Sequence, residues 1–204
     1  MFKRFLFAAA LISAFGSCSA MAQRAAALEG NVVIITPCTL TANQAMAFEE
    51  FVSDGRYNGA FYVSQNGGFS WRSNLNTLDA AKVLANQRCN ETGRNCQIYA
   101  TLVPKKPRIG QVIEGLSMTA ARDAEVWARA NATQGRKVAI AASQYAGWAG
   151  WQGNRSHDRI KSSALNHCGD LLRPRIERLK APQKDALERE GLLNCQIIFT
   201  QPAR

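Results

Sequence analysis

The tetrapeptide Asn-Cys-Gln-Ile occurs twice in the chain, at residues 95–98 and again at residues 194–197. Each copy follows another cysteine, Cys89 in the first case and Cys168 in the second. In both places the earlier cysteine ends a helix-like apolar pattern and the tetrapeptide opens an apolar, strand-like run. This repeated arrangement indicates that the chain is built from two copies of one unit.

A shift of 79 positions aligns the chain with itself, without a gap, upstream of these tetrapeptides. It places Cys89 on Cys168, and the other identities are Ala42 on Ala121, Ala45 on Ala124, Ala60 on Ala139, Ser64-Gln65 on Ser143-Gln144, Gly68 on Gly147, Asp79 on Asp158, Lys82 on Lys161 and Ala85 on Ala164. After the cysteines the shift becomes 99, so the second copy carries a 20-residue insertion. We interpret this pattern as an internal duplication.

Each copy is predicted to run helix, strand, strand, helix, strand. Apolar residues at helical spacing predict first helices after the N-caps Thr41 and Ser117, and second helices after Thr77 and Ser156. Apolar or aromatic runs predict strands over 60–63, 69–71 and 96–102 in copy one, and over 138–141, 148–151 and 195–199 in copy two.

We therefore predict an α+β fold of two tandem α-β-β-α-β copies, each with a small three-stranded sheet and its helices on one face, packed as a pseudo-symmetric pair. The expected boundaries are a signal peptide at 1–22, an N-terminal lead segment at 23–37, copy one at 38–103, a linker at 104–116 and copy two at 117–204, with the insertion at about 170–193. The linker carries two prolines and the one compact basic run of the chain.

The pattern resembles a small bacterial exported repeat, the domain of unknown function 4189. The residues that carry the resemblance are Ala60, Ser64, Gly67-Gly68, Trp71, Ala81, Ala85, Cys89, Cys96 and Tyr99 in copy one, and Ala139, Gly147, Trp148, Ala164-Leu165, Cys168 and Cys195 in copy two. The insertion in copy two and the lack of a further cysteine in a following strand depart from the family pattern. The resemblance implies an exported location and a cysteine-linked small fold, and it implies no reaction.

The N-terminus has the features of a bacterial secretion signal. Lys3 and Arg4 precede an apolar run at 5–12, and small residues end in Ala-Met-Ala at 20–22, where a signal peptidase would cut. The run is shorter than the ~20 residues of a transmembrane helix, and no later stretch is suitable, so we expect a periplasmic or secreted protein with no transmembrane segment. Cys18 leaves a lipoprotein as the alternative, because a lipoprotein signal peptidase would make it the acylated first residue.

The protein is basic. The chain has 25 Lys+Arg and 15 Asp+Glu, and removal of the signal takes away two basic residues, so the mature protein has a net charge of about +8. Exported proteins of this charge attract acidic partners and cell-wall polymers. We therefore expect an envelope protein or an anionic or glycan ligand as the partner, and no nucleic acid.

Five cysteines remain after removal of the signal, and fifteen arrangements of two disulfides are possible. The duplication favours Cys89 with Cys96 and Cys168 with Cys195. Cys38 is left over as a possible free thiol, with three interpretations: a buried thiol, an intermolecular disulfide that makes a dimer, or a reactive thiol. The cysteines and histidines lack the short spacing of zinc modules, so we predict no metal and no other cofactor.

Aromatic residues mark the second strand of each predicted hairpin. The possible binding face consists of Phe69, Trp71, Tyr145, Trp148 and Trp151, which could place their rings on one side of a sheet; the alternative is that they belong to the core. The insertion holds charged residues and a proline, Pro182, that could open a short helix. We expect it to form a solvated lid on copy two, or else a surface for a partner.

These observations favour an exported, non-enzymatic envelope protein that acts as a small binding or interaction module. No catalytic residues are predicted, because the mature chain has only His157 and His167, which would face nearly opposite ways on one helix. The alternatives are a small secreted thiol-dependent enzyme or redox protein that uses Cys38, and an inhibitor or accessory subunit of another envelope factor.

Overall fold

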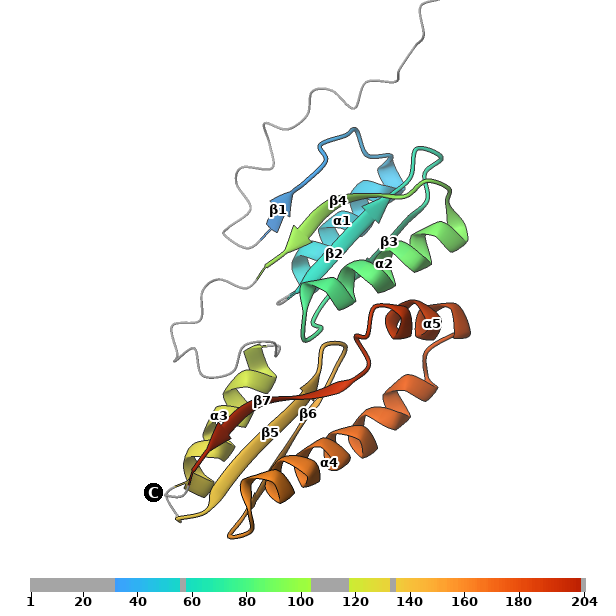
Figure 1. Cartoon of the computed structure of the whole chain (residues 1–204). Coiled ribbons are helices and arrows are strands. Elements are labelled where there is room, and N and C mark those ends of the chain that lie inside the picture. The colour runs from blue at the N-terminus through green and yellow to red at the C-terminus, as the bar shows by residue number, and fades with distance from the viewer. Residues whose placement is uncertain (1–31, 56–57, 104–117, 133–134, 203–204) are drawn as a thin grey trace, which may run out of the picture.

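The computed structural model describes residues 32–55, 58–103, 118–132 and 135–202 (Figure 1). The predicted signal peptide 1–22, Cys18, most of the lead segment and the linker 104–116 lie outside these residues. The described residues form five helices and two antiparallel sheets, which is the α+β class expected. We call residues 32–103 the N-terminal half and residues 118–202 the C-terminal half.

The N-terminal half contains a four-stranded sheet with the strand order β1-β4-β2-β3. Its elements are β1 (Val32–Ile34), α1 (Ala42–Asp54), β2 (Gly59–Val63), β3 (Phe69–Arg72), α2 (Leu78–Thr92) and β4 (Gln97–Leu102). The prediction of three strands was wrong here, because β1 lies in the expected lead segment and pairs with β4. A strand of three residues is too short to show the alternation by which strands are predicted.

The C-terminal half contains a three-stranded sheet with the order β6-β5-β7. Its elements are α3 (Met118–Ala132), β5 (Lys137–Ser143), β6 (Trp148–Gly153), α4 (His157–Glu177), α5 (Ala181–Arg189) and β7 (Cys195–Gln201). Both sheets have an irregular register in the central strand, between Phe61 and Tyr62 in β2 and between Ile140 and Ala141 in β5. These two positions are 79 residues apart.

Helices cover both faces of each sheet, so the prediction of helices on one face was wrong. In β2, Phe61 packs in a cluster with Phe51 of α1, whereas its neighbour Ala60 packs with Ala81 and Ala85 of α2. Successive residues of a strand point to opposite faces. One helix therefore covers each face (Figure 1).

Strand β5 shows the same arrangement. Val138 and Ile140 pack with residues of α3, and Ala139 and Ala141 pack with Ile160 of α4 and its neighbours. All four of these β5 side chains are buried. An apolar run without alternation is typical of a strand covered on both faces, and that signal was present in the sequence.

Both disulfides tie the second helix of a half to the beginning of its last strand: Cys96 directly precedes β4, and Cys195 is the first residue of β7. Cys89 bonds to Cys96 and Cys168 bonds to Cys195, with Cα atoms 6.1 Å apart in each pair. These are the pairs that the duplication favoured. Within the described ranges, no helix is both long and apolar enough to cross a lipid bilayer.

The insertion connects the two halves, which corrects the expectation of a solvated lid on copy two. It contributes the end of α4 and the whole of α5, which begins with Pro182 in its first turn as predicted. Leu187 of α5 is fully buried in a cluster with Ala80 and Leu84 of α2. Helix α5 therefore packs on the N-terminal half (Figure 1).

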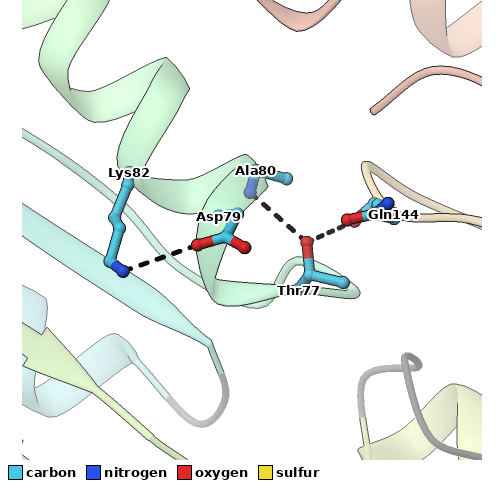
Figure 2. A network of polar contacts seen from close by, with 5 residues as sticks. All are labelled: Thr77, Asp79, Ala80, Lys82 and Gln144. Carbon is cyan, nitrogen blue, oxygen red and sulfur yellow. Dashed lines mark hydrogen bonds and ion pairs between the residues drawn. The ribbon is translucent and has the colours of Figure 1, made fainter. Parts of the chain in front are cut away.

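Hydrogen bonds hold the β5–β6 turn to the start of α2. The Asn76 amide donates from Nδ2 to the carbonyl oxygens of Ser143 (2.8 Å) and Gly147 (2.9 Å). Thr77 is the N-cap of α2: its hydroxyl accepts from the Ala80 N–H at 3.3 Å and donates to the Gln144 carbonyl oxygen at 3.2 Å (Figure 2). One short segment thus begins a helix and binds the other half.

The N-terminal half satisfies its own hairpin turn with a different residue. Gln44 of α1 donates from Nε2 to the carbonyl oxygens of Ser64 and Gly68, each at 3.0 Å, and completes a capping box with Thr41. Under the 79-residue shift these two carbonyls correspond to those of Ser143 and Gly147, which Asn76 binds. The residue aligned with Gln44 is Asp123, whose carboxylate cannot donate. Asn76 of the N-terminal half supplies the side-chain amide that the C-terminal half lacks at this position.

Candidate ligand-binding groove along strand β3

Strand β3 is the last strand of its sheet, and a cavity of about 620 Å³ lies along it. The cavity is lined by the consecutive residues 69–74, by Asp54 at the end of α1, and by Arg88 and Thr92 of α2. We call this cavity the β3 groove. An edge strand presents N–H and C=O groups that no neighbouring strand binds, so the groove offers backbone groups as well as side chains.

Arg72 gives the β3 groove its charge. Its side chain is half-buried, and its Nη1 donates to the Trp71 carbonyl oxygen at 2.9 Å. Among the described residues, the ion pairs within 4.0 Å all involve other cations. Burial lowers the pKa of Arg72, and the nearby Arg88 guanidinium lowers it further, while Tyr145 and Glu91 act in the opposite direction. Arg72 therefore carries a half-buried positive charge that a carboxylate would stabilise.

Arg88 is the second cation of the groove. It pairs with Glu91, three residues along α2, and its side chain stays 39% exposed. Asp54 is the one acidic side chain in the lining. Because Glu91 neutralises Arg88, Arg72 is the guanidinium of the lining that has no ion pair within 4.0 Å among the described residues, and it is the group that an anionic ligand would bind.

Phe69 and Trp71 belong both to the core and to the groove. The Trp71 ring centroid lies 6.0 Å from that of Phe51, and the Phe69 ring stacks at 6.3 Å on Phe61. Both side chains are only half-buried and line the groove. For Phe69 and Trp71, both interpretations of the sequence therefore apply: their rings pack in the core and also line the groove.

The other three aromatic residues do not share a face with them. Tyr145 packs in the α2–α5 cluster between the halves. Trp148 lies on the α3 side of the second sheet, 6.2 Å from Trp127, whereas Trp151 lies on the α4 side, 6.0 Å from His167. The expectation of one aromatic face was wrong, because residues three apart in a strand point to opposite faces.

Matching positions of the two halves hold chemically different pairs. The 79-residue shift places Arg72 on Trp151 and Arg88 on His167. The members of each pair are neighbours: the two guanidinium groups interact electrostatically, and the Trp and His rings meet edge to face. The local sequence does not set Arg72 and Arg88 apart from the other basic residues, and the 79-residue alignment is the signal that could have found them.

Cys38 lies beside a second, smaller cavity of about 340 Å³ in the N-terminal half. The side chain is half-buried and takes part in neither disulfide. The lining includes Thr41, Gln44 and Ser64, and no histidine. His157 and His167 both lie on α4 of the other half, and neither lines the cavity beside Cys38.

Within the described residues, no group of three or more His, Cys, Asp or Glu side chains could hold a metal ion. Comparisons with protein families, with curated proteins and with solved structures find no match to this chain. The resemblance to the domain of unknown function 4189 therefore stays a prediction. What the protein does has to be inferred from the β3 groove itself.

Proposed function

We propose that the protein is an exported, non-enzymatic binding module of the bacterial envelope that holds a carboxylate-bearing ligand in the β3 groove. The observation that carries the proposal is the half-buried Arg72 guanidinium, whose interaction with Trp71 uses a single donor. A guanidinium has five N–H donors and binds carboxylates through two of them at once. The rings of Phe69 and Trp71 supply apolar surface beside that charge.

Two features support the exported location. The secretion signal predicted at 1–22 would send the chain out of the cytoplasm. The two disulfides belong to an oxidising compartment, since cytosolic thiols are kept reduced. The periplasm or the extracellular space is thus the proposed place of action.

We also propose that the halves are diverged copies of one unit in a pseudo-symmetric pair. The order β4-β2-β3 in one sheet corresponds to β7-β5-β6 in the other. The strand irregularities and the disulfides occupy corresponding places in the two halves. On this proposal the arginine pair of the first copy and the Trp151–His167 pair of the second are specialised versions of one ancestral position.

A titration of the mature, isotope-labelled protein with hexagalacturonate, a soluble polycarboxylate, tests the binding proposal by NMR. We expect saturable shifts in the Arg72 side chain and the residue 69–74 backbone, and none with neutral xylohexaose. Arg72→Gln should weaken the binding roughly tenfold, the effect of losing a charge-assisted hydrogen-bond pair.

Arg159→Gln is the matched control for that titration, because it removes one exposed positive charge from α4 of the other half. It should leave the affinity unchanged. Equal losses in the two variants, or shifts spread over all arginines, would show general charge attraction and contradict a site in the β3 groove.

A further inference from the structure

Among the strands that the structure describes, only β2 pairs with β3, so the other edge of β3 has no strand partner there. Antiparallel pairing to β2 matches Tyr62 with Ser70 and Phe61 with Trp71. Along an edge strand, the backbone groups of alternate residues point away from the sheet. The Trp71 carbonyl oxygen accepts from the Arg72 guanidinium rather than from a strand. A side chain of the protein thus occupies an acceptor that an added strand would use.

A charged side chain on an edge strand normally prevents a further strand from adding to the sheet. Here the charge would also select the ligand, because a ligand carboxylate would compete with the Trp71 carbonyl oxygen for the Arg72 guanidinium. A carboxylate is the stronger partner of a guanidinium. When Arg72 turns to a ligand carboxylate, the Trp71 carbonyl is released to accept an N–H from that ligand. This one side-chain movement would free the Trp71 carbonyl oxygen and place the Arg72 guanidinium against a carboxylate.

We propose that the ligand of the β3 groove is an extended acidic peptide that adds to β3 as a fifth strand of the sheet. An acidic side chain of the peptide draws the Arg72 guanidinium away from the Trp71 carbonyl oxygen, which then accepts a hydrogen bond from the peptide backbone. This proposal rests on the proposed function and specifies its ligand. The lining fits such an occupant, since all four residues of β3, Phe69–Arg72, border the cavity. Strand addition takes affinity from main-chain hydrogen bonds and specificity from side-chain contacts.

The groove suits acidic side chains on one side of the peptide. Arg72 lines it beside Arg88 of α2, which is paired with Glu91 and lies close enough to lower the pKa of Arg72, so Arg72 is the main cation for a peptide carboxylate. Alternate residues of an extended peptide lie on one face, about 6.6 Å apart. A peptide with acidic residues at alternate positions can therefore place its carboxylates along the helix α2 side of the groove.

Fluorescence polarisation with a labelled octapeptide, Thr-Glu-Val-Glu-Val-Glu-Val-Thr, tests the proposal on the full mature protein. We expect saturable binding, with roughly tenfold losses for a peptide with Gln in place of Glu and for the Arg72→Gln protein. A peptide N-methylated at alternate amides keeps its charges and loses half its donors. Methylation of the residues whose N–H groups face β3 should weaken binding at least tenfold, and methylation of the other set should not.

The N-methylated pair needs no change in the protein, so it decides the question even if Arg72→Gln does not fold. Equal binding of the two methylated peptides would overturn strand addition. Hexagalacturonate binding that depends on Arg72, together with no peptide binding, would also overturn it while leaving the proposed function intact. If neither probe binds, both proposals fail. Arg159→Gln again serves as the charge control and should bind the octapeptide like the unchanged protein.

Discussion

At the scale of single residues, two amide side chains perform the same task from different places. Gln44 and Asn76 each donate to two carbonyl oxygens of a β-hairpin turn, the first within its own half and the second across the junction. Buried carbonyl groups without a partner are costly. The turn at 143–147 therefore depends on the N-terminal half for its stability.

Asn76→Ala removes both of these donors. We expect the free energy of unfolding to fall by about 1–3 kcal/mol, the cost of leaving buried polar groups unpaired. Urea unfolding followed by tryptophan fluorescence measures the change. Asn166→Ala is the control, because the Asn166 side chain is exposed on α4, and it should have little effect. Similar losses in the two variants would contradict the role given to Asn76.

Part of the structure at the residue scale could be predicted from the local sequence. Thr41 and Thr77 act as N-caps as the sequence indicated, because the capping hydrogen bond joins residues three apart. The role of Asn76 could not be found in this way, since its partners are 67 and 71 residues away. The difference between Gln44 and the aligned Asp123 gains its meaning only from the structure, because the hairpin partners of Gln44 are themselves 20 and 24 residues away.

At the scale of elements, the positions of most strands could be predicted from the sequence, but the sheet faces that the helices cover could not. The apolar run in β5 predicted a strand, but the prediction of helices on one face did not take into account that this run lacks alternation. The packing of Ala139 against α4 and of Ile140 against α3 shows that both faces are buried. Small alanine side chains in the strand let the helix on that face approach closely.

The disulfides are equivalent elements with unequal loops. Cys89–Cys96 spans 7 residues and Cys168–Cys195 spans 27, because the insertion lies within the second loop. The loop-entropy model assigns about 2.4 kcal/mol to the short loop and about 3.5 kcal/mol to the long one. Replacing both cysteines of the longer pair with alanine should therefore destabilise the protein more than the same change in the shorter pair.

Both double variants are best compared in a Cys38→Ser background, which prevents thiol exchange. Urea unfolding at one protein concentration gives the two free energies. All four cysteines become the same residue, and Cys89 and Cys168 are almost completely buried, so the packing losses are similar. An equal effect, or a larger effect for the shorter loop, would show that native packing rather than loop length sets the contribution of these bonds.

At the scale of the whole molecule, the insertion turns two small units into one. Each sheet is small, and small units bury too little apolar surface to be very stable alone. Helix α5 adds Leu187 to a cluster that also contains Leu84 of α2 and Leu192 beyond α5. The sequence showed where the insertion lies and that Pro182 could open a helix. It could not show which half the helix packs on, because its apolar face fits either.

Leu187→Ala tests whether this cluster makes the halves unfold together. The side chain is fully buried, so its truncation should cost about 2–5 kcal/mol. Hydrogen exchange followed by mass spectrometry measures β2 and β5 separately. In the unchanged protein we expect a single global opening to expose both strands. In Leu187→Ala we expect one strand to exchange before the other, since the interface that couples them is weakened.

Leu171→Ala is the control, because Leu171 on α4 is 48% exposed, and it should leave the two strands coupled. Coupled exchange in both variants would mean that the hydrogen bonds of Asn76 and Thr77, rather than α5, join the halves.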